Sequence, residues 1–70
     1  MKELIEQTER KYCIYCRTNR RVKWRYAQYG GRYETIEKAI QKAREHYTEK
    51  AEYIVEDMDG NLVATGFVND

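Results

Sequence analysis

One segment of this chain has the periodicity of an amphipathic helix, and the segments on both sides of it alternate as strands do. Its apolar residues recur at helical spacing and form one stripe: Ile36, Ala39, Ile40, Ala43 and Tyr47. Thr35 precedes the stripe and suits an N-cap, because its hydroxyl can accept a backbone N–H of the first turn. We therefore expect one helix that begins after Thr35 and ends between residues 47 and 50.

Residues 11–17 alternate in the manner of a strand. Tyr12, Ile14 and Cys16 share one face, while Lys11, Cys13, Tyr15 and Arg17 share the other. Residues 18–21 form the expected turn.

A second alternating run covers residues 22–29. Its predicted inner face carries Val22, Trp24 and Tyr26, so Trp24 is expected in the core under the helix. Gly30-Gly31 is expected to break this run and to lead into a short third strand around residues 32–33.

Strand character returns after the helix, at residues 51–58 and 61–68. Asp59-Gly60 between them predicts a hairpin with a type I′ turn, in which both central residues have positive φ. The order is β-β-(β)-α-β-β. We expect an α+β fold: an antiparallel sheet of four to five strands with one helix packed on one face.

The chain has 70 residues, enough for one domain with a thin core. We place that domain at residues 10–70, after a polar arm or short helix at residues 1–9. A monomer or a homodimer is compatible with this size. No apolar run reaches the ~18 residues of a membrane span, and no signal peptide is evident, so we expect a cytoplasmic protein without membrane partners.

Charge is distributed unevenly along the chain, although the net charge is only +1. Residues 10–33 contain eight Lys and Arg residues and no acid, whereas residues 34–70 contain four bases and nine acids. The basic segment also contains most of the aromatic residues. Such a segment is an electrostatic footprint for polyanions.

The outer face of the first hairpin is therefore the candidate site. It combines cations that pair with phosphates and rings that stack on bases. The predicted nucleic-acid-binding residues are Lys11, Tyr15, Arg17, Arg20, Arg21, Lys23, Arg25, Tyr29 and Arg32. The alternative is a solvated surface whose charges meet the acids of residues 45–59 within the fold.

The stretch from Gly30 to Ala39 carries an aromatic, an acid and a threonine, followed by a helix start with an acid and an alanine. It resembles the strand-to-helix junction of AP2-type and integrase N-terminal DNA-binding domains, over roughly residues 11–47. That resemblance implies a three-stranded sheet that docks on DNA through Arg17, Lys23, Arg25 and Arg32. The hairpin after the helix departs from this pattern. The whole chain is similar to small β-β-β-α-β-β proteins, a likeness that implies no activity.

Metal binding and catalysis are not expected. Cys13 and Cys16 have zinc-ligand spacing, but a structural site needs four ligands and His46 is the only histidine. On one strand the two thiols would point to opposite faces and their Cα atoms would lie about 10 Å apart, too far for a disulfide. Cys16 is expected in the core and Cys13 as an exposed thiol. With no serine and no cofactor motif, we expect neither an enzyme nor a bound cofactor.

Two functions remain. The first is a small binding domain for DNA or RNA. The second is a protein-interaction module, such as a small regulator or inhibitor encoded by a mobile element, whose basic face meets an acidic protein surface. Tyr, Trp and Arg are enriched in protein interfaces, and the first hairpin contains all three.

Overall fold

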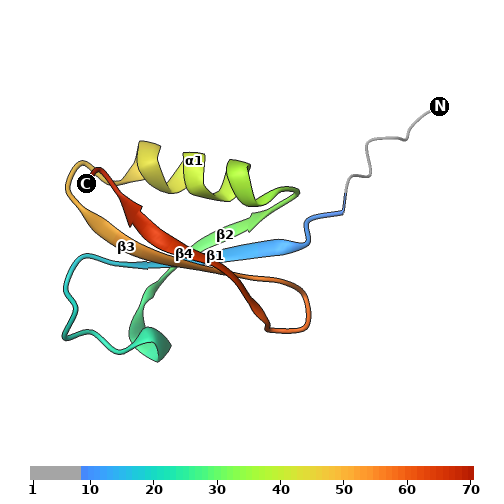
Figure 1. Cartoon of the computed structure of the whole chain (residues 1–70), viewed down its shortest axis with the longest axis horizontal. Helices are drawn as coiled ribbons and strands as arrows, with labels where there is room; N and C mark the ends of the chain where they lie inside the picture. Colours follow the sequence, from blue (N-terminus) through green and yellow to red (C-terminus); the bar gives the residue numbers. More distant parts are fainter. Residues whose placement is uncertain (1–8) are drawn as a thin grey trace.

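Four strands and one α-helix form this domain, in a computed structural model that describes residues 9–70. Residues 1–8 of the predicted arm lie outside the described residues. The elements in chain order are β1 (Tyr12–Arg17), the short 3-10 helix η1 (Trp24–Tyr26), β2 (Gln28–Tyr33), α1 (Ile36–His46), β3 (Ala51–Glu56) and β4 (Leu62–Val68). The strands pair antiparallel in the order β2-β1-β3-β4, and α1 packs on one face (Figure 1). The predicted fold class is confirmed.

The helix begins where the sequence predicts. The Thr35 Oγ1 atom accepts the backbone N–H of Lys38 at 3.0 Å, which satisfies one donor of the first turn. Ala39 and Ala43 are buried against the sheet. The helix ends at His46, and the Tyr47 N–H still bonds to the Ala43 carbonyl at 3.0 Å.

The core lies between α1 and the inner face of the sheet. Its largest fully buried side chains are Ile14, Cys16, Val55 and Val68. Ile14 lies opposite Val55 across β1 and β3, in the register that the alternation of residues 11–17 requires. The inner face predicted for this strand is therefore correct. This core is small, so single contacts matter to the stability of the domain.

The predicted strand at residues 22–29 is wrong. Residues 18–27 form a loop that contains η1. Three backbone hydrogen bonds hold this loop: Val22 N to Asn19 O at 3.0 Å, Tyr26 N to Lys23 O at 2.8 Å and Ala27 N to Trp24 O at 3.0 Å. The chain joins the sheet only at Gln28, and β2 then runs through Gly30-Gly31 without a break. In the described part of the chain the sheet consequently has four strands, and no separate third strand precedes the helix.

Gly30 and Gly31 form a bulge in β2. The register moves from Tyr15 opposite Tyr29 to Cys13 opposite Arg32, so two glycines face the single residue Ile14. Gly31 has a φ of 101°, and a Cβ on Gly30 would lie 2.8 Å from the Ile14 Cγ2 atom. Glycine at both positions therefore lets the strand continue where side chains would stop it.

The bulge changes the face on which the next tyrosine lies. Tyr29 and Tyr33 are four residues apart, so simple alternation would place both on one face. Tyr29 instead lies beside Tyr15 on the face away from α1, whereas Tyr33 lies opposite Tyr12 and packs against the core. One inserted residue thus gives β2 a tyrosine on each face.

The second hairpin turns between β3 and β4, but not by a type I′ turn. Gly60 has a φ of 83°, whereas Asp59 is not among the residues with positive φ. The Asp57 carboxylate accepts the N–H groups of Asp59 and Asn61, each at 2.9 Å, and the Asp57 carbonyl accepts the Gly60 N–H at 3.1 Å. Because this side chain organises the loop, only one residue needs the left-handed conformation.

Within residues 9–70, no helix is long and apolar enough to cross a membrane.

Candidate nucleic-acid interface

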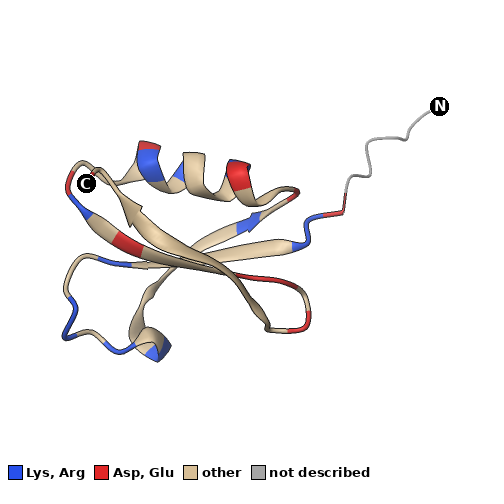
Figure 2. Cartoon of the chain, in the orientation of Figure 1, with Lys and Arg blue, Asp and Glu red and all other residues tan. Residues whose placement is uncertain are grey.

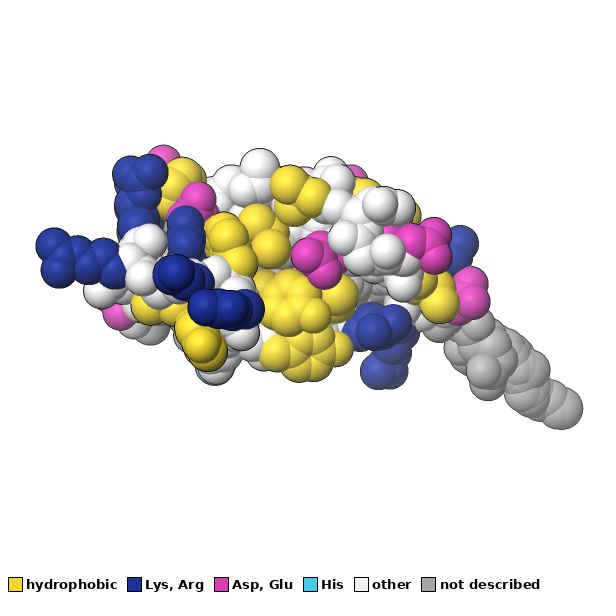
Figure 3. All heavy atoms as spheres, turned by 90° about the horizontal axis from the view of Figure 1, so that it is seen from below, with side chains coloured by type: hydrophobic (Ala, Val, Ile, Leu, Met, Phe, Trp, Pro, Cys, Tyr) yellow, Lys and Arg dark blue, Asp and Glu magenta, His cyan; other side chains and the backbone are white. Residues whose placement is uncertain are grey.

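The sheet face opposite α1 is not covered by the helix, and we call it the outer face (Figure 1). The register of the four strands places these residues on it: Cys13, Tyr15, Arg17, Tyr29, Arg32, Glu52, Ile54, Glu56, Leu62, Thr65 and Phe67. Figure 3 views the molecule from this side and shows hydrophobic side chains gathered in the middle, with several Lys and Arg side chains at one end. Aromatic and cationic groups are therefore neighbours on one surface.

Tyr15 and Tyr29 form a ring pair on the outer face. Their centroids are 5.5 Å apart and their planes are tilted by 53°, with Tyr29 55% exposed. The Cys13 thiol donates to the Tyr15 hydroxyl across 3.9 Å, and this contact, with burial, raises the pKa of Tyr15. Tyrosine is already neutral at physiological pH at its ordinary pKa of about 10, so the phenol does not repel an anion.

Trp24 lies on the outer side of the sheet, so its predicted place in the core is wrong. It is half-buried and, with Tyr15, Arg25 and Ile54, lines a pocket of about 360 Å³. The guanidinium carbon of Arg17 lies 4.1 Å from the centroid of the Trp24 ring. Tyr26, predicted on the same inner face, is 71% exposed. Both residues sit in the loop, where strand alternation does not apply.

Arg17 uses its donors within the fold. Its Nε and Nη2 atoms lie 3.0 and 2.8 Å from Oε1 of Glu52, and its Nη1 atom lies 2.6 Å from the carbonyl oxygen of Val22. Its side chain is only 14% exposed. Arg17 thus fixes the start of the loop on the sheet, and its charge is paired with Glu52.

Four predicted site residues lie together on the loop between β1 and β2. They are exposed, and we call them the basic loop: Arg20, Arg21, Lys23 and Arg25. Lys23 and Arg25 were predicted on a strand, and they instead lie beside the sheet on and next to η1. Among the described residues, none of the four has an acidic partner within 4.0 Å. Figure 2 shows their charge on one loop and acids in the turn between β3 and β4.

The two remaining predicted residues lie at the opposite end of β1. Lys11 precedes this strand, and its Nζ atom is 4.0 Å from a Glu9 carboxylate oxygen. Arg32 is exposed on β2 opposite Cys13. The structure therefore brings the basic loop to one end of the ring pair and leaves Lys11 and Arg32 at the other.

The apolar part of the outer face, on β3 and β4, was not predicted from the sequence. Ile54 lies beside Tyr15, and Phe67 and Leu62 are 42% and 60% exposed. The alternation of residues 51–56 could have predicted it, because Tyr53 and Val55 on the inner face require Ile54 to point outward. The same reasoning places Glu52 and Glu56 on this face, where they line pockets with Arg20 and Arg25, so the outer face is mixed in charge.

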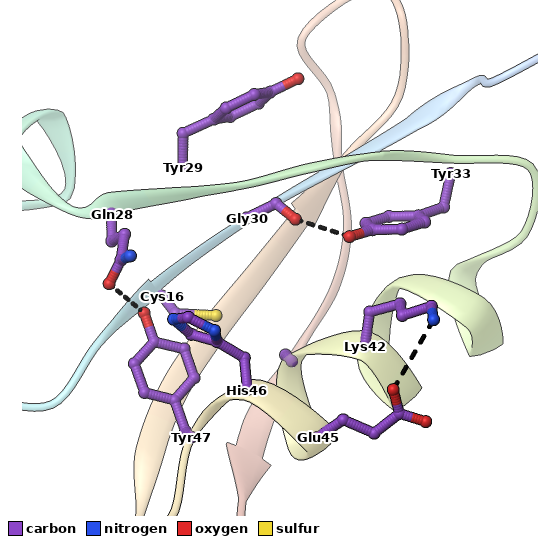
Figure 4. A pocket seen from close by; sticks show the side chains of 10 residues that line it. Cys16, Gln28, Tyr29, Gly30, Tyr33, Lys42, Glu45, His46 and Tyr47 are labelled. Carbon is purple, nitrogen blue, oxygen red and sulfur yellow. Dashed lines mark hydrogen bonds and ion pairs between the residues drawn. The ribbon is translucent and has the colours of Figure 1, made fainter.

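A second pocket of about 390 Å³ lies between β2 and the end of α1 (Figure 4). The Tyr47 hydroxyl donates to Oε1 of Gln28 at 2.7 Å, and Lys42 lies 3.6 Å from Glu45. Burial raises the pKa of the Cys16 thiol, which keeps it protonated. The groups that line this pocket thus pair with one another.

Within the part of the chain that the structure describes, no three His, Cys, Asp or Glu side chains are grouped to hold a metal ion. No family model, curated protein or solved structure matches this chain. Function is therefore inferred from the geometry of the outer face.

Proposed function

We propose that this domain binds single-stranded nucleic acid on its outer face, beside the basic loop. One observation carries the proposal: Arg25 of the basic loop and Tyr15 of the ring pair line the same pocket. A base that stacks on the tyrosines would thus have its phosphate within reach of the cations. Aromatic platforms with a basic flank are the usual means of binding unpaired strands.

Single strands fit this surface better than duplexes. Only an unpaired base exposes a face on which Tyr15 or Tyr29 can stack. A duplex would offer phosphates to the basic loop and leave the two rings without a partner. The resemblance to AP2-type and integrase N-terminal domains also implies a sheet face as the binding surface, although on duplex DNA, so a duplex probe is part of the test.

The acids of the second hairpin would orient the strand. Glu56 lines the pocket that Tyr15 and Arg25 share, and Asp57 and Asp59 follow it in the turn beyond β3. Phosphates are repelled there and attracted by the basic loop. We therefore expect the backbone of the bound strand to follow the basic loop and its bases to point towards the ring pair, with Lys11 and Arg32 adding longer-range attraction.

The test is fluorescence anisotropy with labelled single-stranded DNA, single-stranded RNA and duplex DNA. We expect the single strands to bind more tightly than the duplex at about 50 mM salt. If the four cations of the basic loop each neutralise one phosphate, log K should fall with log salt with a slope of about −3, since each contact with a single strand contributes about −0.7.

Tyr29 gives the matched pair of variants. Tyr29→Ala should weaken binding of a single strand by about 5- to 150-fold, the range for one lost stacking contact of about 1–3 kcal/mol, while Tyr29→Phe should bind nearly as well as the native protein. Absence of binding at low salt would remove the proposal. If the protein prefers duplex DNA and Tyr29→Ala does not change its affinity, binding depends on phosphate contacts and not on stacking.

A protein partner is the second candidate, and the apolar side chains of β3 and β4 favour it. Ile54, Leu62 and Phe67 extend the outer face across β3 and β4. Exposed apolar groups rimmed by charges are typical of protein interfaces. A pull-down with and without nuclease separates the two candidates, because a protein that stays bound after nuclease treatment does not depend on nucleic acid.

A further inference from the structure

Strand β4 forms one edge of the sheet, and none of its residues is charged. Within residues 9–70, the sheet order β2-β1-β3-β4 leaves one side of β4 without a neighbouring strand. Its seven residues, Leu62–Val68, contain no Lys, Arg, Asp, Glu or Pro. Natural edge strands normally carry such residues, since an unprotected edge pairs with another strand.

The other edge of the sheet is protected. Strand β2 contains the bulge at Gly30-Gly31 and the exposed Arg32. A bulge interrupts the even row of backbone groups, and a charge opposes pairing. Strand β4 also has a register shift, at Val63 near its start, but its remaining residues pair regularly and none is charged. The two edges therefore differ mainly in charge and in where the bulge lies, and β4 is the edge more open to the addition of a strand.

Apolar exposure is also concentrated on β4. Six large hydrophobic side chains are exposed in the described residues, and three of them belong to this strand: Leu62, Val63 and Phe67. A domain of 70 residues has a thin core and gains much from additional apolar burial. The exposed side chains of β4 and its position at the edge of the sheet thus both favour pairing with another strand.

We propose that β4 pairs antiparallel with β4 of a second copy of this chain, giving a dimer with one continuous eight-stranded sheet. A second copy fits because the edge is uncharged and each chain carries a net charge of only +1, so like copies repel little. Two-fold symmetry makes the contact self-complementary. With Thr65 at the middle of the strand on the axis, Val63 of each copy lies opposite Phe67 of the other.

Such a dimer enlarges the outer face. The two-fold axis of an antiparallel strand pair is perpendicular to the sheet, so both helices lie on one side and both outer faces on the other. The two ring pairs and the two basic loops would then share one surface. The dimer itself does not depend on nucleic acid, so it can be tested without any oligonucleotide.

Sedimentation velocity of the full chain tests the dimer, from micromolar to millimolar concentration and without nucleic acid. We expect the native protein to approach twice its 8.5 kDa mass as concentration rises. Thr65→Lys should stay monomeric, because the two ammonium groups would face each other across the axis. Thr65→Val lacks the same hydroxyl without adding charge and should still dimerise, as should Gln41→Lys, which adds the same charge on an exposed position of α1.

Circular dichroism must show that each variant is folded, and amide hydrogen exchange locates the interface. We expect exchange of the β4 amides to slow as the native protein is concentrated. A native protein that is monomeric at millimolar concentration would overturn the proposal. This is also the result expected if β4 pairs with a different protein. A dimer that persists in folded Thr65→Lys, or whose β4 amides exchange at the monomer rate, would also overturn it.

Discussion

Arg17 and Trp24 are in contact on the outer side of the sheet, with the guanidinium carbon 4.1 Å from the centroid of the indole ring. The same guanidinium binds Glu52 on β3 and the carbonyl of Val22 in the loop. A single side chain therefore connects the sheet, the start of the loop and its one tryptophan. The position of the basic loop beside the ring pair depends on this connection.

Arg17→Lys should destabilise the domain by about 1.5–3 kcal/mol, the range for hydrogen bonds to charged groups. Lysine keeps the charge, but it cannot form the two bonds to Glu52 and the bond to Val22 together. Urea denaturation followed by circular dichroism measures the change. Arg20→Lys is the control, and as an exposed substitution it should stay within about 0.5 kcal/mol of the native protein. Equal stability of the two variants would show that Arg17 is dispensable.

Asp57 should make the stability of the second hairpin depend on pH. Hydrogen bonds, first from the Asn61 N–H, lower the pKa of this carboxyl in the folded protein. A lowered folded pKa means that the stabilisation is present above the unfolded pKa of about 4 and is lost as pH falls through the folded value. Asp57→Asn should therefore be less stable than the native protein at about pH 7, and the difference should shrink at about pH 3.

Urea unfolding of both proteins at the two pH values measures this effect. A difference in stability that stays constant from neutral to acidic pH would contradict the assigned role of the Asp57 carboxylate.

Both thiols should be unreactive in the folded protein. Cys16 is buried in the core, and burial raises its pKa, which lowers the fraction of reactive thiolate. Cys13, predicted as an exposed thiol, is only 7% exposed, because Tyr15 and its neighbours on β2 and β3 cover it. An aromatic disulfide reagent should label neither thiol in native buffer and both in denaturant. Rapid labelling of one thiol in the native protein would place Cys13 at the surface.

The helix and β1 could be predicted from the sequence because their periodicity and their burial have the same cause. The stripe from Ile36 to Tyr47 and the alternation of Ile14 and Cys16 both reflect one buried face. The N-cap at Thr35 is a local interaction and needs no tertiary information.

The segment after β1 could not be predicted in this way, because contacts from elsewhere in the chain decide its structure. Residues 22–29 alternate as well as β1 does, but Arg17 binds the carbonyl of Val22 and packs on Trp24, which favours a loop. The position of Tyr29 on the outer face agrees with the prediction, whereas the bulge that then turns Tyr33 inward depends on the close approach of Gly30 to Ile14. The alternation of residues within one segment predicts neither the loop nor the bulge.

The charge of the basic loop gives the most direct test of function. Reversing Lys23 and Arg25 to Glu should leave the fold within about 0.5 kcal/mol, because both side chains are exposed. Binding to single strands should fall by more than about tenfold, and the slope of log K against log salt should become shallower by about 1.4, the contribution of two lost phosphate contacts. Anisotropy titrations over a series of salt concentrations measure both quantities.

Reversing Lys42 and Arg44 on α1 is the matched control, since it changes the net charge by the same amount at exposed positions of the helix, outside the outer face. We expect this control to lose little affinity and to keep the salt slope of the native protein. Equal losses in the two double variants would mean that only net charge matters and that the basic loop is not the site. If neither variant loses affinity, the phosphates lie elsewhere, and the apolar outer face on β3 and β4 becomes the better candidate, with a protein as its partner.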